Sequence, residues 1–526
     1  MKFKKLGKTF SKSLLAASLV LALASCGEDD KKPVNQAVSA KPAVVKKAAG
    51  KTYTGAEQAE VAEKRYRQYY ENSNQMLAML FKHQPIDIKF NVDEYVKGEQ
   101  NSTAKTSAKI TVKGEESLDL GLNLSEEINH DDALAADKKI AVVKSKYSVQ
   151  VSGEKKPLPE ELNNATAEYL DTSWDILADG SYQANIAIKP VNKEENGTIF
   201  KYDGLTAKTI VSDLDKPVFP FTAEIKSGEL KFFDTEDSLT LTPIDITAFR
   251  DEKGAGEFKI SPFKLESKDQ FTVNFAKGIT FKEQDKYDAE IETLIAETTS
   301  FSIPDVTVGD KKVTVEIAEI SGNSATTKKG SAYSSGFSFK ISPKTDLVKM
   351  LAGMDGLAVK STEFEFNFAG MSVATIKEFQ ELMGSIYAHK SDDEVEKLGK
   401  LFLEKLIPDL AANNGEMKMA LKAETEAGKA HANLVIKVKK DAKSLTEEDI
   451  AVLDSKDEKA AMKIITDRVL VNVDISVAKD ILAKSGVEAM LLITAKDFVK
   501  EENGNYVFQA ELTSDGLKVN GKAIPL

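Results

Sequence analysis

Apolar and polar residues alternate along much of this chain between residues 86 and 345. In the first such run, polar neighbours separate Ile86, Ile88, Phe90 and Val92. Similar runs recur at residues 118–124, 147–151, 186–188, 239–241, 258–260, 273–275, 313–317 and 337–341. Successive side chains of a β-strand point to opposite faces, so a period of two predicts strands that are buried on one face only.

Turn-forming residues separate these runs, at positions 153–154, 196–197, 254–256 and 309–310. Short turns join antiparallel neighbours, and antiparallel sheets commonly have one apolar and one solvated face. The sequence therefore predicts an α+β fold that is mostly β: long, curved antiparallel sheet or sheets with peripheral amphipathic helices.

Helical spacing of apolar residues predicts five amphipathic helices, at 55–84, 345–353, 373–384, 392–412 and 478–484. The first is the longest, and Pro85 ends it. Its tyrosines Tyr66, Tyr69 and Tyr70 suit either a ligand surface or a packing face, and helical spacing favours packing. We expect this helix to lie across a sheet through Tyr66, Tyr69 and Leu80.

The second half contains a recurring unit, in which an alternating strand leads through a short turn into an amphipathic helix. The three copies are 337–351, 364–383 and 469–484. Their spacing is irregular, which favours internal duplication over a solenoid. We also expect a loop at 424–429 and a helical connection at 440–461.

Cys26 is the only cysteine, and the residues before it form a secretory signal. Five lysines stand near the start of the chain, and the apolar run at 14–23 is shorter than the ~20 residues of a membrane-spanning helix. The run ends in Leu23-Ala24-Ser25-Cys26, which resembles the lipobox of bacterial lipoproteins. That resemblance implies cleavage before Cys26 and lipid on this residue, and the alternative is an ordinary signal peptide with a chance cysteine after it.

These features predict four parts. They are a lipoprotein signal peptide at 1–25, a charged and Ala-, Pro- and Lys-rich tether at 26–53, a helix plus β-rich domain at 54–345, and a strand–helix repeat domain at 346–526. Removal of the signal takes the 71 basic residues to 66 against 83 acidic ones, a net charge of −17. Such an acidic chain disfavours binding to nucleic acid or to the anionic face of a membrane.

Few residues offer catalytic or metal-binding chemistry. None of the four histidines is at metal-ligand spacing with another; they are His83, His130, His389 and His431. Ser-x-x-Lys pairs begin at Ser102, Ser261 and Ser476, but the partner motifs of penicillin-interacting enzymes are missing. Acidic clusters at 28–30 and 447–449 lack the order of a calcium loop. Trp174 suits carbohydrate stacking or packing, and packing is favoured. We therefore expect no enzyme activity, no cofactor and no metal site.

Four segments together resemble the YdgA-like envelope proteins of Gram-negative bacteria, a family of unknown function. They are the helix that begins at Gly55, the stretch 95–106, the strand and helix that begin at Phe364, and the C-terminal Leu517-Lys518-Val519-Asn520-Gly521-Lys522. The resemblance covers residues 55–526 and supplies no catalytic residues. Two features depart from the family: a lipobox stands in place of its usual transmembrane anchor, and Glu99-Gln100-Asn101 replaces an aromatic-rich stretch.

Three classes of function follow from these observations. The first is a non-catalytic, lipid-anchored envelope protein, expected at the outer membrane because Gly27, not Asp, follows Cys26. Its sheet would bind a partner protein or an apolar, lipid-like ligand in a groove that the few helices leave uncovered. The second is a surface-exposed adhesin or host-contact protein, since acidic residues after a lipidated cysteine resemble export signals. The third, an enzyme, has no supporting constellation of residues.

Overall fold

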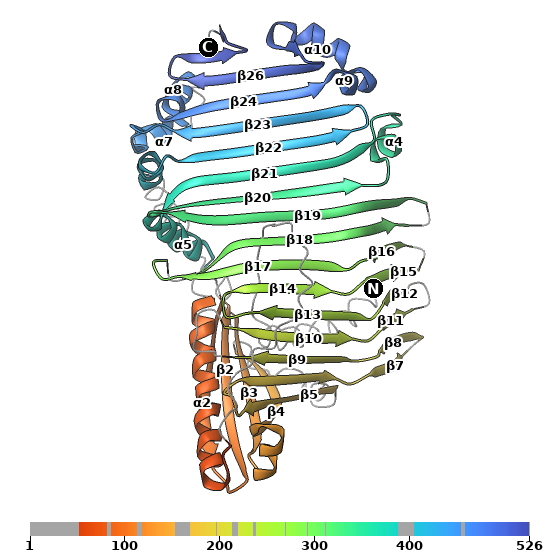
Figure 1. The fold of residues 1–526 in the computed structure, drawn as a ribbon, viewed down its shortest axis with the longest axis vertical. Coiled ribbons are helices and arrows are strands. Elements are labelled where there is room, and N and C mark those ends of the chain that lie inside the picture. The colour runs from red at the N-terminus through yellow and green to blue at the C-terminus, as the bar shows by residue number, and fades with distance from the viewer. Residues whose placement is uncertain are drawn as a thin grey trace.

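The computed structural model describes residues 52–80, 86–112, 118–152, 169–195, 197–212, 219–234, 238–268, 270–291, 293–310, 312–387, 404–453 and 458–524. The described part is mostly β, and its strands form one large antiparallel sheet that does not close. Figure 1 shows the strands from β5 (Leu170–Leu177) to β26 (Asn505–Thr513) stacked along the long axis of the molecule, whereas β2 (Asn101–Val112), β3 (Leu118–Asn129) and β4 (Lys139–Ser152) run roughly along that axis beside the first helix; further helices lie at the margins of the sheet. The predicted fold class is confirmed.

The first part of the sheet contains β1 (Ile86–Val96), β2 (Asn101–Val112), β3 (Leu118–Asn129), β4 (Lys139–Ser152), β5 (Leu170–Leu177) and β6 (Tyr182–Ile188). The middle part contains β7 (Val191–Glu195), β8 (Thr198–Tyr202), β9 (Leu205–Val211), β10 (Phe221–Ser227), β11 (Leu230–Phe233), β12 (Ser238–Leu241), β13 (Ile244–Arg250), β14 (Ala255–Ile260), β15 (Phe263–Ser267), β16 (Phe271–Phe275) and β17 (Ile279–Asp288).

The last part contains β18 (Thr293–Gly309), β19 (Thr314–Lys329), β20 (Ala332–Pro343), β21 (Val359–Ser372), β22 (Glu416–Thr425), β23 (Gly428–Val438), β24 (Val469–Ala478), β25 (Lys500–Glu502), β26 (Asn505–Thr513), β27 (Gly516–Val519) and β28 (Lys522–Ile524). The segment expected to be a loop at 424–429 is shorter in the structure, because Glu424 and Lys429 pair in the ladder and only two residues turn between β22 and β23.

The main ladder runs from β1 through β6 to β9, β10, β13, β14 and β17, and then continues from β18 to β24, β26, β27 and β28. A second, shorter ladder branches from β18; we call it the wing, and it consists of β16, β15, β12, β11, β8 and β7. The predicted division at residue 345 falls after β20. Because β20 pairs directly with β21, the ladder runs through this point.

A crease of prolines and glycines separates the wing from the main ladder. The chain crosses from one to the other at Pro190, Gly204, Gly228, Pro243, Pro262 and Gly278. Proline has no N–H to donate, and Gly204 takes a left-handed φ of 94° where a Cβ would lie 2.6 Å from the carbonyl oxygen of Ile188. Proline and glycine in a strand-rich sequence usually indicate that the chain reverses. Here they mark points at which a long strand bends and then continues in the other ladder.

The described helices are α2 (Gly55–Leu80), α4 (Leu347–Ala352), α5 (Val373–Tyr387), α7 (Glu447–Leu453), α8 (Glu458–Arg468), α9 (Lys479–Ser485) and α10 (Glu488–Thr494), with short 3-10 turns η1 (Asp132–Asp137) and η2 (Lys496–Phe498). Residues 404–412 are also helical, whereas the first part of the helix predicted at 392–412 lies outside the described residues. Each predicted strand–helix unit is present, as β20–α4, β21–α5 and β24–α9. Within the described residues, no helix combines the length and apolar character needed to cross a bilayer.

Helix α2 is the only one of these helices that runs along β2 and β3 at the N-terminal end of the sheet (Figure 1). It buries Tyr66 completely and stacks Tyr69 against Trp174, with ring centroids 4.5 Å apart. The side-chain amide of Asn74 also binds both the N–H and the C=O of Phe90, at 2.7 and 2.8 Å, which closes the free edge of β1. The packing role of Tyr66 and Tyr69 is thus confirmed, while the side chain of Leu80 lies outside the description.

Candidate functional site

One face of the sheet carries a continuous row of direct cross-strand partners, nearly all of them apolar. We call it the central row; it runs from β3 to β26 through Ile128, Val143, Trp174, Ala184, Thr209, Ala223, Ala248, Phe258, Phe281, Phe301, Gly322, Phe339, Phe364, Leu421, Ala432, Ile475 and Phe508. Directly opposed residues of antiparallel strands lie on the same face. The sheet therefore has one largely apolar face from β3 to β26.

A second row of cross-strand partners lies on the same face, two residues along each strand from the central row. Most residues in the middle of this second row are polar or charged. This flanking row runs through Tyr182, Val211, Phe221, Arg250, Gly256, Glu283, Thr299, Ser324, Phe337, Phe366, Met419, Leu434 and Val473. Its charged members sit between an aromatic N-terminal part and an aromatic C-terminal part. The apolar face is thus divided into two regions.

The N-terminal region of this face is covered. Ile128 and Val143 have no exposed surface and Trp174 is 7% exposed, because α2 packs over them. Rings of Tyr66 and Trp174 stack with centroids 5.7 Å apart, and Tyr182 packs beside them.

The C-terminal region of this face remains open. Phe337, Phe339 and Leu421 are 40%, 37% and 55% exposed, although they occupy the same rows as the buried residues of the N-terminal region. The ring of Phe337 lies 5.6 Å from those of Phe364 and Phe366, so the side chains form one apolar surface over β20, β21 and β22. We call the row residues on β18 to β24 the open apolar face.

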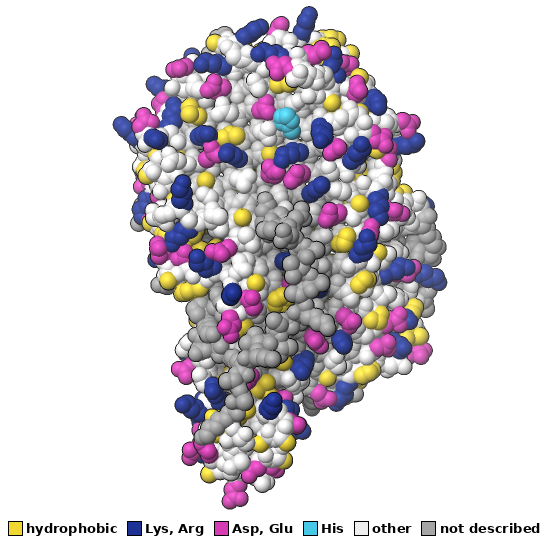
Figure 2. Space-filling view, in the orientation of Figure 1, with side chains coloured by type: hydrophobic (Ala, Val, Ile, Leu, Met, Phe, Trp, Pro, Cys, Tyr) yellow, Lys and Arg dark blue, Asp and Glu magenta, His cyan; other side chains and the backbone are white. Residues whose placement is uncertain are grey.

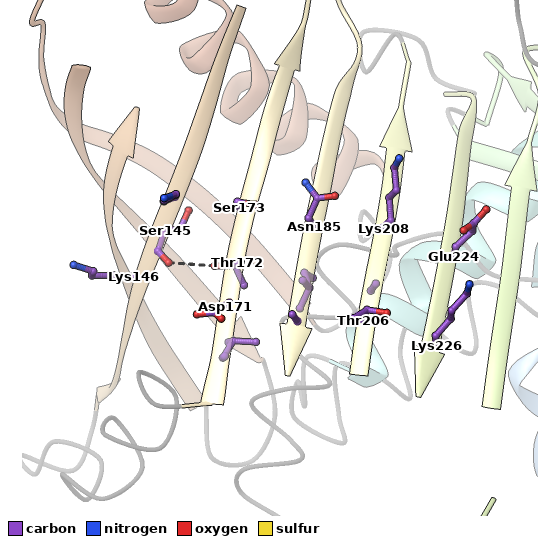
Figure 3. A pocket seen from close by; sticks show the side chains of 15 residues that line it. Ser145, Lys146, Asp171, Thr172, Ser173, Asn185, Thr206, Lys208, Glu224 and Lys226 are labelled. Carbon is purple, nitrogen blue, oxygen red and sulfur yellow. Dashed lines mark hydrogen bonds between the residues drawn. The ribbon is translucent and has the colours of Figure 1, made fainter. Parts of the chain in front are cut away.

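The opposite face is polar. Figure 2 shows charged side chains of both signs spread over the face in view, with hydrophobic side chains scattered among them. A groove of about 800 Å³ lies across β4, β5, β6, β9 and β10 on this polar side (Figure 3). Lys208 and Glu224 are cross-strand neighbours in it, and Lys144, Lys226 and Asp171 also line it. Four lysines and two acidic residues line the groove, so its lining has a net charge of +2.

A buried carboxylate connects α2 to the sheet. Glu126 is 2% exposed and accepts hydrogen bonds from five uncharged donors: the hydroxyls of Tyr66, Tyr70, Thr106 and Ser145 and the indole N–H of Trp174. Burial, together with the neighbouring carboxylate, raises the pKa of Tyr66 and of Tyr70. The tyrosine hydroxyls therefore stay protonated and donate, which satisfies a charge that would be costly to bury alone.

The polar middle of the flanking row is a buried ion cluster. The guanidinium Nη2 of Arg250 lies 2.7 Å from Oε1 of Glu283 and 2.6 Å from Oδ2 of Asp285. Phe219 and Phe221 place their rings over the same guanidinium. Burial raises the pKa of Asp285 to about 6, although Arg250 opposes this shift and Glu283 adds to it. The single positive charge of Arg250 thus faces two carboxylates. Its attraction does not offset the effect of burial on the charged form of Asp285.

The residues that the sequence offered for chemistry are scattered. His130 is buried and bonds Ser102 through Nε2 at 2.9 Å, and burial lowers its pKa. His431 lies at the polar face beside Asp474, 2.9 Å away. Cys26, His83 and His389 lie outside the described residues.

The Ser-x-x-Lys pairs are not brought together either. Lys105 binds Glu94 and Lys479 binds Glu501, whereas Ser261 accepts a bond from the backbone N–H of Asp245. Trp174 packs against tyrosines, as expected. Among the described residues, no group of His, Cys, Asp and Glu side chains could hold a metal ion.

Sequence reasoning missed Glu126 and the Arg250 cluster, although a signal for both was present. Glu126 stands at the inward position of its strand, in step with Leu124 and Ile128. Arg250 is likewise in step with Ala248, and Glu283 with Phe281. A charged residue at an inward position of an alternating strand indicates a buried polar site.

A family model described as "Bacterial protein of unknown function (DUF945)" matches residues 31–526. A comparison with curated proteins finds no match. Because the family model spans nearly the whole chain, the protein belongs to this family of bacterial proteins of unknown function, DUF945.

Proposed function

We propose that this protein is a lipid-anchored envelope protein that holds an apolar ligand, a lipid acyl chain or an apolar peptide segment, on its open apolar face. The anchor is the lipid on Cys26, and the charged segment 26–53 is the tether that lets the body reach its ligand. No bond of the ligand is made or broken in this scheme.

The observation that carries the proposal is the change in exposure along one continuous row. Val143 has no exposed surface at the N-terminal end, whereas Leu421 in the same row is 55% exposed. Contiguous exposed apolar surface is costly in water and marks a binding site when it is extended. An elongated apolar molecule that lies along the row would cover Phe337, Phe339 and Leu421 together.

A binding role without catalysis also agrees with the burial and bonding of the inward-facing carboxylates among the described residues. Of the carboxylates at inward positions, Glu126 and Asp285 are buried and the side chain of Glu283 is 9% exposed, and all three are already bonded within the protein. Catalytic groups must reach a substrate, and these face neighbouring side chains.

The ligand test uses a pair of substitutions on one strand. Phe339 lies on the open apolar face and Lys340, next to it in β20, on the polar face. The native protein should co-purify with lipid or gain thermal stability with added acyl chains, by about 2.7 kcal/mol at a hundredfold excess over the dissociation constant. Phe339→Glu should abolish the gain, and Lys340→Glu should keep it. Lipid-free native protein without a thermal shift would refute ligand binding.

The location is tested separately. Cys26→Ser should release the protein from the membrane fraction, and a variant that remains bound after a high-salt wash would show that lipid on Cys26 is not the anchor. We place the protein at the outer membrane, so fractionation with inner-membrane markers would contradict that part. Digestion by protease on intact cells would instead favour the surface-exposed adhesin.

A further inference from the structure

Two short helices at one side margin of the sheet present the most exposed large apolar side chains of the described residues. Ile493 in α10 is 83% exposed and Leu351 in α4 is 80% exposed. Six more side chains around them are also exposed: Met350, Met354, Val487, Met490, Leu492 and Phe498. We call these eight residues the apolar rim.

The two helices belong to one surface, although more than 100 residues separate them. Figure 1 shows α4, α9 and α10 at the same margin of the sheet. The Nζ of Lys484, in α9, donates to the carbonyl oxygen of Gly356, just after α4, at 3.3 Å. The strands β20 and β24 lead directly into α4 and α9, so the rim continues the open apolar face at the ends of its strands.

Two ion pairs and a hydrogen bond from a tyrosine lie beside the rim. Lys349 lies 2.7 Å from Asp355, Lys479 lies 2.8 Å from Glu501, and the hydroxyl of Tyr506 donates to Glu488 at 2.7 Å. Residues 346–356 and 479–502 together carry seven acidic and five basic side chains, so charge gives this margin no attraction to an anionic partner. Its binding free energy must come from burial of apolar side chains.

The composition of the rim favours lipid over a protein partner. Its exposed members are Leu, Ile, Val, Met and Phe, with none of the Trp, Tyr and Arg in which the hot spots of protein interfaces are enriched. Side chains that project singly from short helices suit a fluid apolar phase, which needs no complementary pocket. Amphipathic helices of this kind lie with their apolar face about 5–10 Å deep in the headgroup and acyl boundary.

We propose that the apolar rim inserts into the surface of a phospholipid bilayer. This orients the ends of β20 and β24 toward the membrane, so that an acyl chain passes from the bilayer to the open apolar face without crossing water. The passage of the acyl chain to the open apolar face rests on the proposed function, whereas insertion of the rim into the bilayer does not.

The test places one fluorescent label on the rim. Because Cys26 is the only native cysteine, the full chain with Cys26→Ser and Ile493→Cys carries a single site for an environment-sensitive dye. With vesicles of phosphatidylethanolamine and phosphatidylglycerol, the emission should shift to the blue, and quenchers on the lipid acyl chains should reduce it. Vesicles of phosphatidylcholine alone should give the same result, because apolar burial drives insertion.

Two controls make the result specific. The same label at Val96→Cys, which is 53% exposed on β1, should keep its emission in water and escape the acyl quenchers. Leu351→Asp with Met490→Asp should abolish the shift at position 493 while the fold persists, because both positions are highly exposed.

Each other outcome overturns the proposal or separates it from ligand binding. Unchanged emission at position 493 with saturating vesicles would refute insertion. A shift without vesicles, rising with protein concentration, would assign the rim to a second copy of the chain. Insertion by a protein that purifies lipid-free and shows no thermal shift with added acyl chains would refute the proposed ligand binding and leave the rim standing. Bound lipid with an aqueous label would do the reverse.

Discussion

The two ends of the apolar face have the same strand pattern but different cover. At the N-terminal end α2 lies over β1 to β6, and the row residues Ile128 and Val143 are fully buried. At the C-terminal end the helices stand at the side margins, and Phe339 and Leu421 in the same row are substantially exposed. The alternation of apolar and polar residues therefore determines which face of the sheet is apolar. Whether that face is buried depends on whether a helix packs over it.

The side chains of the two ends agree with this difference. The covered end combines aromatic rings with polar tips, and those tips bond the buried Glu126. The open end uses Phe, Leu, Met and Ile, which need no polar partner and can pack against an incoming apolar chain. Stability should depend on the first end and binding on the second.

The largest effect on stability should come from Tyr66→Ala. It removes a fully buried ring and should cost about 3–5 kcal/mol of unfolding free energy. Phe366→Ala, a half-exposed ring of the open end, should cost clearly less. Denaturant unfolding followed by fluorescence of Trp174, the single tryptophan, reports directly on the covered end. Equal losses would mean that the open end is packed like a core.

A smaller loss should follow Glu126→Gln. The amide keeps the shape but loses the charge, so the donors around it lose bonds worth about 1.5–3 kcal/mol to a charged acceptor. The neighbour Glu127 points to the opposite face, where it pairs loosely with Lys146. Glu127→Gln should therefore leave the unfolding midpoint within about 0.5 kcal/mol of native. A neutral Glu126→Gln would show that the buried charge does not hold α2 in place.

The smallest effect concerns pH and the ion cluster between the two ends. The folded pKa of Asp285, about 6, lies above its unfolded value of about 3.9, so the folded state binds more protons between these limits. The contribution of Asp285 should thus make stability fall as pH rises from 4 to 6. Arg250 and Glu283 are the charged groups that face it. Asp285→Asn should remove this fall in urea midpoints measured at pH 4, 5, 6 and 7, and an unchanged slope would exclude Asp285 as its source.

The sequence was sufficient to predict the strands, because the alternation of apolar and polar residues in β3 or β20 is unambiguous. It was also sufficient to predict α2 and the strand–helix units. It did not reveal that Pro190, Pro243 and Pro262 lie on one crease, since proline ends a strand locally while the chain continues on the far side. Nor did it show the pairing of β6 with β9, which depends on that crease. Exposure of Leu421 could not be predicted either, because it depends on where helices distant in sequence come to lie.

The central claim is that an apolar chain lies on the C-terminal end of the apolar face, and photo-crosslinking tests it most directly. A phospholipid with a photoreactive group in its acyl chain is incubated with the protein, irradiated, and its attachment sites are mapped by peptide mass spectrometry. Our account predicts attachment in β20, β21 and β22 around Phe337, Phe339 and Leu421, and loss of that attachment in Phe339→Glu. Attachment confined to the polar face, or unchanged in Phe339→Glu, would contradict it.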